Sequence, residues 1–466
     1  MFFSILSLEE IRDWEQQSWK SGVKSKDVID AVGTELEFAT RELRLSFAHV
    51  LILAGKGNNG ADALALARSL PASHAQTVIK VSDPIRALEE FKRFTAECRG
   101  AKVLLFDGLF GVGLNRPLNS EYTALIRAIN SSGFHRISID VPSGLDDGGK
   151  PCPEAVQAHQ TYTVGVAKSA FMGGDAADFT GTISVVQNVG LLPVTPLGQF
   201  QWSDWSEESE PNRRAESHKG SYGHVAIFAG SKGYHGAAIL CARGAMRAQP
   251  GLVTVITTTE TYLPVASQVQ APMVREWEVP FELPEKTSAI VAGPGFAAKN
   301  IPAALKTLMQ ELWNTFPGPM VVDASAMEWL PAGGPLSWPR VITPHPGEAA
   351  RLLGKAISEI QSDRASALRA LSSKYGNCWV VLKGHQTLIG RNEGLISVNS
   401  SGNATMSQGG TGDILAGYLG GLLAQPELQK TLEKTICFGV WRHGHAGDLA
   451  KIENPGWVTE QFVGWL

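Results

Sequence analysis

The chain has 466 residues, of which 44% are hydrophobic and 18% are charged, and its formal net charge is −4. At about 150 residues per domain this length predicts two or three domains, and we take two as the starting number. The small net charge excludes a broadly basic surface of the kind that binds nucleic acid, so a soluble protein that acts on small molecules is expected.

The start of the chain and its cysteines predict a cytoplasmic protein. The first ten residues, MFFSILSLEE, lack the basic region of a signal peptide. No stretch reaches the ~18 apolar residues of a membrane span, so no membrane association is expected. The cysteines stand far apart, without the spacing of metal ligands or of a disulfide framework, which predicts reduced thiols at Cys98, Cys152, Cys241, Cys378 and Cys437.

Short β-branched runs alternate with helical patterns in the first half of the chain. This alternation predicts crossover connections and a parallel sheet that helices cover on both faces. The predicted strands lie at 49–55, 77–81, 102–111, 136–144, 161–168 and 182–191, with helices at 61–70 and 120–130.

A polar segment that contains proline and lacks periodicity, residues 195–217, separates the two halves. Beyond it the pattern of strands and helices begins again, without repeating the motifs of the first half. We therefore predict two α/β domains, residues 1–200 and 218–466, joined by a linker at 201–217. The second set of strands is expected at 222–230, 252–257, 289–295, 319–325, 340–348 and 378–384, with a helix at 237–249.

A glycine-rich turn, GKGNNGAD at 55–62, follows the first predicted strand and opens a helix. Its glycines permit a tight turn, and the helix N-terminus offers N–H groups and the positive end of the helix dipole to a phosphate. The spacing differs from the GxGxxG dinucleotide fingerprint. The polar side chains of Asn58, Asn59 and Asp62 have little structural use in such a turn, and they favour a binding site.

Two later strands of the first half end in acidic residues. Asp107 ends one strand, and Asp140 ends another just before Ser143. Ligands bind beyond the carboxyl ends of the strands of an open parallel sheet, so these loops and the glycine-rich turn are expected to face one pocket. Oxygen ligands from Asn59, Asp107 and Ser143 suit a hard cation. The alternative is that Asp107 and Asp140 only cap turns.

The stretches AGKGNNGAD, FDGLFGVGL and IDVPSGLD, in this order, resemble the YjeF N-terminal family of NAD(P)H-hydrate epimerases over roughly residues 45–190. The resemblance implies a Rossmann-like parallel-sheet sandwich, a catalytic Asp140 that contacts the hydrated nicotinamide nucleotide, and K⁺ at Asn59, Asp107 and Ser143. It also implies that the substrate's phosphates are held by Asn58, Asn59, Gly60, Ala61, Asp62, Gly111, Val112, Gly113, Leu114, Asn115, Arg116 and Pro117.

The chain departs from this family in two places. Ala61 and Ala63 stand where glycine is usual, and VIDAVG (28–33) replaces a Met-Glu-Asn-Ala-Gly-like stretch. The two methyl groups are expected to crowd the phosphate-binding turn.

The strongest motif of the second half is GGTGD at 409–413, which opens an apolar helix. Backbone N–H groups and the helix dipole at this point favour a bound anion, with the carboxylate of Asp413 beside it. A carboxylate so placed can accept the proton of a substrate hydroxyl during phosphoryl transfer. The alternative is that Asp413 caps the helix.

The segment ITPHPGEAARLLG at 342–354 combines a strand end, a Pro-Gly corner and the start of a helix. By itself it favours a structural turn, in which Glu348 is a first-turn charge of the helix. Other motifs at predicted strand ends instead favour a shared site that includes His345 and Glu348. These motifs lie at 218–238, 293–295, 321–325, 382–387 and 402–417.

Over residues 215–460 these motifs resemble the ADP- or ATP-dependent NAD(P)H-hydrate dehydratases, which share the ribokinase-like fold. The chain departs from that family at Ser325, Ser407 and Gln408, none of which removes Asp413. The resemblance implies that the hydrated nucleotide contacts residues 345–351 and Asp413: His345, Pro346, Gly347, Glu348 and Arg351, with Gly293 and Gly295 nearby. It implies that ADP or ATP is held by Lys383, Gly384, His385, Gln386, Thr387, Gly409, Gly410, Thr411 and Gly412.

The run WRHGHAGDLA suggests a metal site at His443, His445 and Asp448. Histidines two residues apart on a helix point to different faces, so this pattern favours packing.

The two resemblances together predict a bifunctional repair enzyme for hydrated NADH and NADPH. One domain epimerises the R and S hydrates, and the other dehydrates the S form while it consumes ADP or ATP, with Mg²⁺. A homo-oligomer without nucleic-acid or membrane partners is expected. The alternative is a small-molecule kinase of ribokinase-like type fused to a non-catalytic nucleotide- or protein-binding module.

Overall fold

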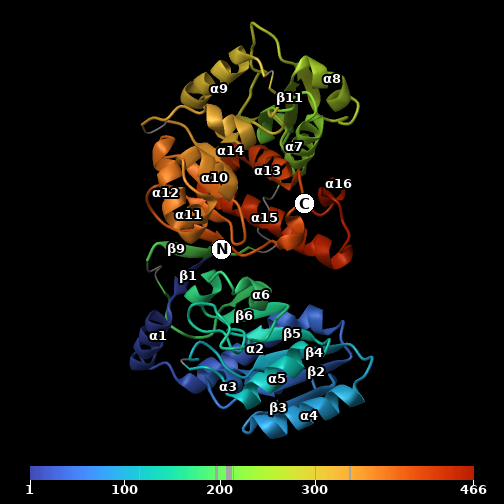
Figure 1. Ribbon diagram of the computed structural model, residues 1–466, viewed down its shortest axis with the longest axis vertical. Helices are drawn as coiled ribbons and strands as arrows, with labels where there is room; N and C mark the ends of the chain where they lie inside the picture. The colour runs from blue at the N-terminus through green and yellow to red at the C-terminus, as the bar shows by residue number, and fades with distance from the viewer. Residues whose placement is uncertain (115, 195–197, 206–212, 214, 300, 335–336) are drawn as a thin grey trace. The chain divides into compact units, whose positions relative to one another are not determined.

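The computed structural model describes residues 1–466 except 115, 195–197, 206–212, 214, 300 and 335–336. The chain forms two compact units, Phe2–Asp204 and Trp205–Leu466 (Figure 1). Each is a mixture of helices and strands, and the predicted α/β class is confirmed.

The first unit is built on a six-stranded sheet in the order β3-β2-β4-β5-β6-β8, with every neighbouring pair parallel. Each of these strands overlaps a segment that the sequence predicts to be a strand, although three of them begin one residue earlier than predicted. They are β2 (His49–Ala54), β3 (Gln76–Lys80), β4 (Val103–Gly108), β5 (His135–Ile139), β6 (Gln160–Val164) and β8 (Thr182–Val186).

Helices cover both faces of this sheet, as its continuous apolar strands require. Val50 and Ile52 of β2 pack with α2 (Ser25–Arg44) and α3 (Asn58–Ser69). The alternate residues Leu51 and Leu53 pack on the other face with α4 (Pro84–Glu97) and α5 (Ser120–Asn130). The remaining helical segments of this unit are α1 (Leu8–Lys20), η1 (Ser169–Met172) and α6 (Ala177–Thr180).

The predicted boundary of the linker is wrong at its start, because residues 200–203 form a strand. This strand, β9 (Phe200–Ser203), pairs antiparallel with β1 (Phe2–Leu6), which also pairs with β7 (Ala167–Lys168). Trp202 of β9 is only 1% exposed. The residues Phe-Gln-Trp-Ser alternate apolar and polar, but they are the shortest run that can indicate a strand and they lie in a polar segment, so residues 201–203 are predicted from the sequence to belong to the linker. The predicted linker residues 206–212 and 214 lie outside the described part of the chain.

The second unit contains a larger sheet in the order β12-β11-β10-β13-β14-β15-β16-β17-β18. The strands from β12 to β16 are parallel, and β17 and β18 add an antiparallel hairpin. The bounds are β10 (His224–Phe228), β11 (Leu252–Thr257), β12 (Met273–Glu276), β13 (Ala289–Ala292), β14 (Met320–Val322), β15 (Arg340–Ile342), β16 (Trp379–Leu382), β17 (Leu388–Gly390) and β18 (Ile396–Asn399).

Two helices of this unit, α7 (His235–Arg247) and α13 (Thr411–Leu423), approach each other at glycines. A Cβ atom at Gly417 would lie 1.9 Å from the Cys241 carbonyl oxygen, and one at Gly244 would lie 2.2 Å from that of Ile414. The backbones therefore touch, and this contact sets the position of the first turn of α13.

Further helical segments lie in the described part of the second unit. They are η3 (Lys219–Tyr222), α8 (Thr259–Ala266), α9 (Ala303–Thr315), η4 (Ala324–Trp329), α10 (Pro346–Leu353), α11 (Ile357–Ser362), α12 (Arg364–Lys374), η5 (Ala404–Met406), α14 (Pro426–Gln429), α15 (Leu432–Glu453) and α16 (Thr459–Phe462).

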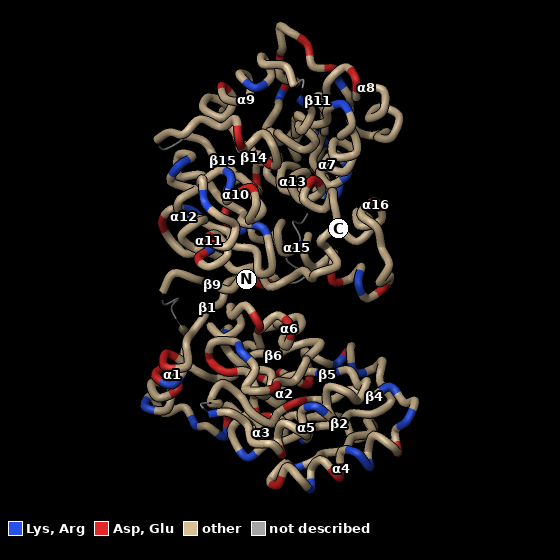
Figure 2. The backbone as a smooth tube through the Cα atoms, viewed as in Figure 1, with Lys and Arg blue, Asp and Glu red and all other residues tan. Residues whose placement is uncertain are grey.

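Acidic and basic residues are interspersed along both units (Figure 2), in keeping with the small net charge. All five cysteines are described, and each carries a free thiol. Among the described residues, no helix combines the length and the apolar character that a membrane crossing requires.

Candidate active sites

The glycine-rich turn of the first unit joins β2 directly to α3, as predicted. Gly57 is the N-cap residue, and Asn58 begins the helix. A Cβ atom at Gly60 would lie 2.0 Å from the carbonyl oxygen of Gly55, so only glycine fits at this close approach of the turn to the helix. The first turn of α3 thus lies at the carboxyl end of the sheet, where N–H groups are available to an anion.

Asn59, Asp107 and Ser143 come together in a buried cluster, although they belong to α3, to β4 and to the loop after β5. Ser143 Oγ donates to Asp107 Oδ1 at 2.6 Å. Asn59 Nδ2 donates to the Phe110 carbonyl at 2.6 Å, and Phe110 N donates to Ser143 Oγ at 2.8 Å. The sequence-based grouping of these three residues is therefore reproduced in space.

Two features of this cluster fit a bound cation. Asn59 Oδ1 is buried and has no hydrogen-bond partner among the described residues. Burial raises the pKa of Asp107, although the carboxyl accepts hydrogen bonds from Ser143, Ser138 and Leu109. An orphaned oxygen and a buried carboxylate without a basic side chain bonded to it are what a monovalent cation would compensate.

Asp140 lies beside this cluster in an unusual backbone conformation, with φ of +68°. Its carboxylate Oδ1 lies 2.6 Å from Nζ of Lys168, which is buried. The same ammonium donates to the carbonyls of Val164 and Val166 at 2.7 and 3.0 Å, so all three of its donors are used. These contacts fix the position of the Lys168 ammonium, and its ion pair with Asp140 fixes the position of that carboxylate.

The charge of Asp140 acts on the pKa values of two further carboxyl groups, those of Asp62 and Glu15. Burial and then the charge of Asp140 raise the pKa of Asp62 to about 8. The pKa of Glu15, which projects from α1, is raised by the same two causes. Asp62 therefore keeps its proton at neutral pH, whereas Asp140 is paired with an ammonium.

The loop at 111–117 contributes to the cluster mainly through its first residue. A Cβ atom at Gly111 would lie 3.1 Å from Asp140 Oδ2. Val112 packs with Leu6, Ile11 and Val166. Of the other predicted contacts, Gly113, Arg116 and Pro117 are exposed, Leu114 is half-buried, and Asn115 lies outside the described residues.

The expected crowding of the turn by Ala63 is wrong. Ala63 is fully buried, and its methyl group is the atom that a Cβ at Gly108 would meet, at 2.5 Å. The methyl group therefore points toward β4, away from the phosphate-binding turn. Ala61 donates its N–H to the Gly57 carbonyl at 3.1 Å within the first turn of α3 and is half-buried.

In the second unit, the loop before α13 is the segment for which the sequence predicts an anion site. Gly410 is the N-cap residue with φ of +96°, a conformation that favours glycine, and Asp413 is the third residue of the helix. Asp413 does not cap α13, because no side-chain cap bond is formed. The Thr411 hydroxyl instead donates back to the carbonyls of Met406 and Gln408, which ties the loop to the helix.

Asp413 faces a network of charged residues from three other elements. Asp323, at the end of β14, accepts hydrogen bonds from Lys383 Nζ at 2.9 Å and from Thr343 Oγ1 at 2.6 Å. Lys383 Nζ also lies 3.8 Å from Glu348 Oε2. A Cβ atom at Gly412 would lie 3.3 Å from Lys383 Nζ, so the first turn of α13 adjoins this network.

This environment raises the pKa of Asp413 to about 7. Burial is the largest cause, the charge of Asp323 adds to it, and Lys383 opposes it. Burial also lowers the pKa of Lys383, but the charges of Asp323 and Glu348 outweigh burial and raise it. The site thus holds a protonated lysine beside a carboxyl group that titrates near neutral pH, which suits a general base.

The corner at 342–354 forms a capping box on α10. His345 Nδ1 accepts from the N–H groups of Gly347 and Glu348 at 3.0 and 3.3 Å, and Glu348 Oε2 accepts from the His345 N–H at 2.8 Å. The structural role of the corner is therefore present. Because Glu348 also approaches Lys383, the same residue belongs to the candidate site.

The sequence resemblance assigns Glu348 to the hydrated nucleotide and Lys383 to ADP or ATP. Lys383 lies between Glu348 and Asp323, so the two predicted sets meet at one residue. Pro346 opens α10, and Arg351 pairs with Glu328 at 3.0 Å.

The remaining predicted residues line the same edge of the sheet. Gly293 and Gly295 have positive φ, and a Cβ atom at Gly293 would lie 1.9 Å from the Asp323 carbonyl oxygen.

The turn that follows Lys383 is fixed by Arg364, which donates to the carbonyls of Leu382 and His385. Within that turn Gly384 and His385 are exposed, Gln386 is buried, and the Thr387 hydroxyl donates to the Gly384 carbonyl. Gly409 accepts a hydrogen bond from Thr459.

His443, His445 and Asp448 of α15 have separate packing roles. His443 Nε2 lies 2.9 Å from the Thr411 carbonyl, whereas His445 stacks on Trp441 at 4.8 Å. Asp448 accepts from the Gly402 N–H and from Asn403 Nδ2. His443 and Asp448 therefore support the loop that leads to Asp413.

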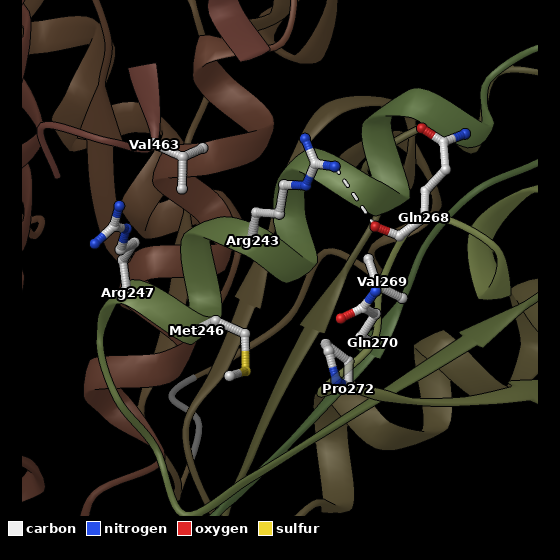
Figure 3. A pocket seen from close by; sticks show the side chains of 8 residues that line it. All are labelled: Arg243, Met246, Arg247, Gln268, Val269, Gln270, Pro272 and Val463. Carbon is white, nitrogen blue, oxygen red and sulfur yellow. Dashed lines mark hydrogen bonds between the residues drawn. The ribbon is translucent and has the colours of Figure 1, made fainter. Parts of the chain in front are cut away.

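A cavity of about 320 Å³ lies elsewhere on the second unit and contains none of the predicted site residues. It opens beside α7, where Arg243 points toward the Gln268 carbonyl (Figure 3). Its lining comprises Arg243, Met246, Arg247, Gln268, Val269, Gln270, Pro272 and Val463.

Three residues of these sites were missed from the sequence: Lys168, Asp323 and Thr343. Lys168 is the last residue of a predicted strand, and Asp323 lies near the end of another, 319–325. Their position at strand ends was therefore a usable signal, because ligands bind there in parallel sheets. Nothing in the sequence indicates that Lys168 pairs with Asp140.

Two family models match the chain. The YjeF-related protein N-terminus matches residues 25–170, and NAD(P)H-hydrate dehydratase matches residues 225–461. The bifunctional NAD(P)H-hydrate repair enzyme Nnr of Escherichia coli is 32% identical over 86% of this chain and 80% of its own length. The chain belongs to the bifunctional NAD(P)H-hydrate repair enzymes.

Another repair enzyme, that of Coxiella burnetii, is 32% identical over 95% of this chain and 94% of its own length. The ADP/ATP-dependent NAD(P)H-hydrate dehydratase of Bacillus subtilis, crystallised with ATP and Mg²⁺, is 28% identical with a TM-score of 0.50, over 56% of this chain and 95% of its own. The repair enzyme thus joins an NAD(P)H-hydrate epimerase to an NAD(P)H-hydrate dehydratase in one chain.

Proposed function

We propose that this repair enzyme dehydrates the S hydrate with Asp413 as the general base and ADP as the phosphoryl donor. Water loss from the hydrated ring is slow because hydroxide is a poor leaving group. In the proposed reaction the oxygen of the ring hydroxyl attacks the terminal phosphorus of ADP, and Asp413 takes the proton of this hydroxyl. The attack releases AMP. The phosphate group then leaves as inorganic phosphate when the ring nitrogen supplies its electron pair and forms a double bond to that carbon, and loss of a proton from the neighbouring ring carbon gives the dihydronicotinamide.

The observation that carries this proposal is the placement of Asp413 beside Lys383 at a helix N-terminus, with a pKa raised to about 7 by burial and the charge of Asp323. At neutral pH such a carboxyl is partly ionised and can both accept and hold a proton. Lys383, fixed by Asp323 and Glu348, supplies positive charge for the transferred phosphoryl group. The N–H groups of residues 409–412 would hold the nucleotide's phosphates, with Mg²⁺ bound to them.

The decisive assay is incubation of the full chain with hydrated NADH and ADP. Return of NADH absorbance with release of AMP and phosphate supports dehydration, whereas a stable phosphorylated product would show that the second unit is a kinase. The same assay with ATP tests the nucleotide preference.

For the first unit we propose epimerisation at the carbon that carries the hydroxyl. Asp62, which is protonated at neutral pH, donates its proton to the departing hydroxyl, and the ring nitrogen forms a double bond to that carbon. A second water molecule then adds to the opposite face and gives its proton to Asp140. A protonated Asp62 as proton donor and an Asp140 that pairs with Lys168 fit this division of roles. Lys168 positions Asp140 through their 2.6 Å ion pair.

We propose that Asn59, Asp107 and Ser143 hold K⁺ beside this site, on the support of the orphaned Asn59 oxygen and the buried Asp107 carboxylate. When bound, the ion adds positive charge near the substrate's phosphates. The expected cytoplasmic location and homo-oligomeric state stay predictions.

The potassium proposal predicts that K⁺ stabilises the parent protein more than Na⁺ of equal ionic strength. Binding to the folded state alone raises the midpoint of thermal unfolding. Asn59→Ala, which removes the orphaned oxygen, should abolish the difference between the two salts. An equal response of the parent to both salts would contradict the site.

His345 is predicted to act mainly through the structure of α10. His345→Ala removes the acceptor of two N–H groups and should lower the free energy of unfolding by about 0.5–2 kcal/mol, as for other N-cap losses. His345→Asn, which can accept the same bonds, should retain stability in denaturant titration. If His345→Asn also weakens binding of hydrated NADH without changing that of ADP, the imidazole contacts the substrate directly, as the sequence analysis expects.

A further inference from the structure

A second cavity lies at the carboxyl ends of β10 and β11 in the dehydratase unit and has a volume of about 180 Å³. Ser231 and Lys232 reach it from the loop after β10, and Thr258, Thr259 and Glu260 reach it from the start of α8. Trp277, directly after β12, and Pro302 close its other sides. None of these residues belongs to the predicted substrate or nucleotide contacts.

The cavity lies on the same edge of the sheet as Asp413. From β14, which carries Asp323, the order of neighbouring strands is β13, β10 and β11. Strands lie about 4.8 Å apart, so the cavity is roughly 10–14 Å from the carboxylate network. The glycine loop after β13 lies between them, and Ser231 Oγ donates to the Gly295 carbonyl at 2.5 Å.

The composition of the cavity suits one half of a nucleotide. The half-buried indole of Trp277 packs on Phe281 with ring centroids 5.0 Å apart and provides a flat apolar surface. Lys232 is exposed and supplies a positive charge, and Glu260 and the two threonines provide groups that can bond ribose hydroxyls. Pockets for whole drug-sized ligands measure about 300–1,000 Å³, so this cavity has room for only part of a dinucleotide.

We propose that this cavity receives the adenosine end of the hydrated dinucleotide whose nicotinamide end lies at Asp413. The proposal rests on the dehydratase function in that it places the same substrate. In it the adenine stacks on Trp277, Lys232 pairs with a phosphate of the dinucleotide, and the pyrophosphate crosses the glycine loop at residues 293–295. The nucleotide that donates the phosphoryl group stays on the opposite side of Asp413, at Lys383.

The experiment compares two substrates on the full chain with ADP: hydrated NADH and hydrated reduced nicotinamide mononucleotide, which lacks the adenosine half. Trp277→Ala should raise KM for hydrated NADH about tenfold, in line with the usual loss of one base–aromatic stack, and should leave KM for the truncated substrate within twofold. Trp277→Phe should retain most of the affinity. Trp338→Ala, at a tryptophan that is 43% exposed, is the matched control and should change neither value.

Lys232→Met tests which phosphate of the substrate Lys232 contacts, the pyrophosphate or the 2′-phosphate. A loss with both hydrated NADH and hydrated NADPH assigns Lys232 to the pyrophosphate, and a loss with hydrated NADPH alone assigns it to the 2′-phosphate. An unchanged KM for ADP shows that each variant is folded.

A Trp277→Ala variant that changes both substrates alike, or neither, would overturn the proposal. If the parent does not regenerate NADH, the dehydratase mechanism fails separately. The same variants are then compared by calorimetric titration with the two hydrated compounds, where loss of the parent's preference for the longer one is still the expected result.

Discussion

Asp413→Asn is expected to lower the turnover number for dehydration by a factor on the order of 10²–10⁴ while ADP binding stays close to that of the parent. The amide has nearly the shape of the carboxylate but cannot take the proton of the ring hydroxyl. The N–H groups of residues 409–412 are unchanged, so the nucleotide's phosphates keep their contacts. Turnover is measured by the return of NADH absorbance, and ADP binding by calorimetric titration.

The control for this variant is Asp363→Asn, at the N-cap of α12, where the amide oxygen can still accept from the Ser366 N–H. It should leave turnover unchanged. Turnover of Asp413→Asn within a few-fold of the parent would exclude Asp413 as the base.

The pH profile gives a second test of the same residue. Because the pKa of Asp413 is raised to about 7, the parent's rate should rise with pH up to about 7 and then level off. A carboxyl whose pKa is raised in the folded state favours the protonated form, so stability is lost as pH rises from about 4 to 7. Asp413→Asn should therefore lose the pH-dependent rise in rate and be at least as stable as the parent at pH 8.

Asp140→Asn is expected to lower the rate of epimerisation at least 10²-fold and to leave dehydration of the S hydrate unchanged. The proposed proton acceptor is removed, and Lys168 loses its charged partner. The residues of the dehydratase site all come from the second unit, so that site is untouched. Separation of both epimers over time, beginning from the pure R hydrate, measures the first rate.

Asp146→Asn serves as the matched control, because Asp146 lies in the same motif but closes a turn, in which it accepts from the N–H groups of Gly148 and Lys150 and from the Cys152 thiol. It should epimerise normally.

The parent should lose epimerisation above pH of about 8, where Asp62 gives up the proton that it donates. Loss of both activities in a folded Asp140→Asn protein would mean that the two reactions are not independent.

The sequence predicted the parallel strands and the loops at their ends because both depend on local patterns. Runs such as HVLILAG and YGHVAIFAG are apolar on both faces, which is typical of strands covered on both sides. From those strands it followed that Asn59, Asp107 and Ser143 meet, and the structure brings them together.

The features that could not be predicted depend on contacts between distant segments. The strand β9 exists because β1, nearly 200 residues earlier, pairs with it. The same holds for Lys168, whose partner Asp140 directly follows β5, and for Lys383, which joins two motifs that the sequence assigned to different ligands. The direction of the Ala63 methyl group depends on Gly108 of a neighbouring strand, and the sequence alone assigned it to the wrong side.

The glycine contact between α7 and α13 bears on how this enzyme can change during evolution. The distance of Asp413 from Asp323 and Lys383 depends on backbone atoms that already touch at Gly244 and Gly417. At these two glycines no side chain lies between the helices, so a mutation cannot change the distance between the helices in small steps. Selection can therefore tune the rate through the charges around Asp413, whereas the spacing itself is inherited almost unaltered because even one added methyl group would displace the whole helix.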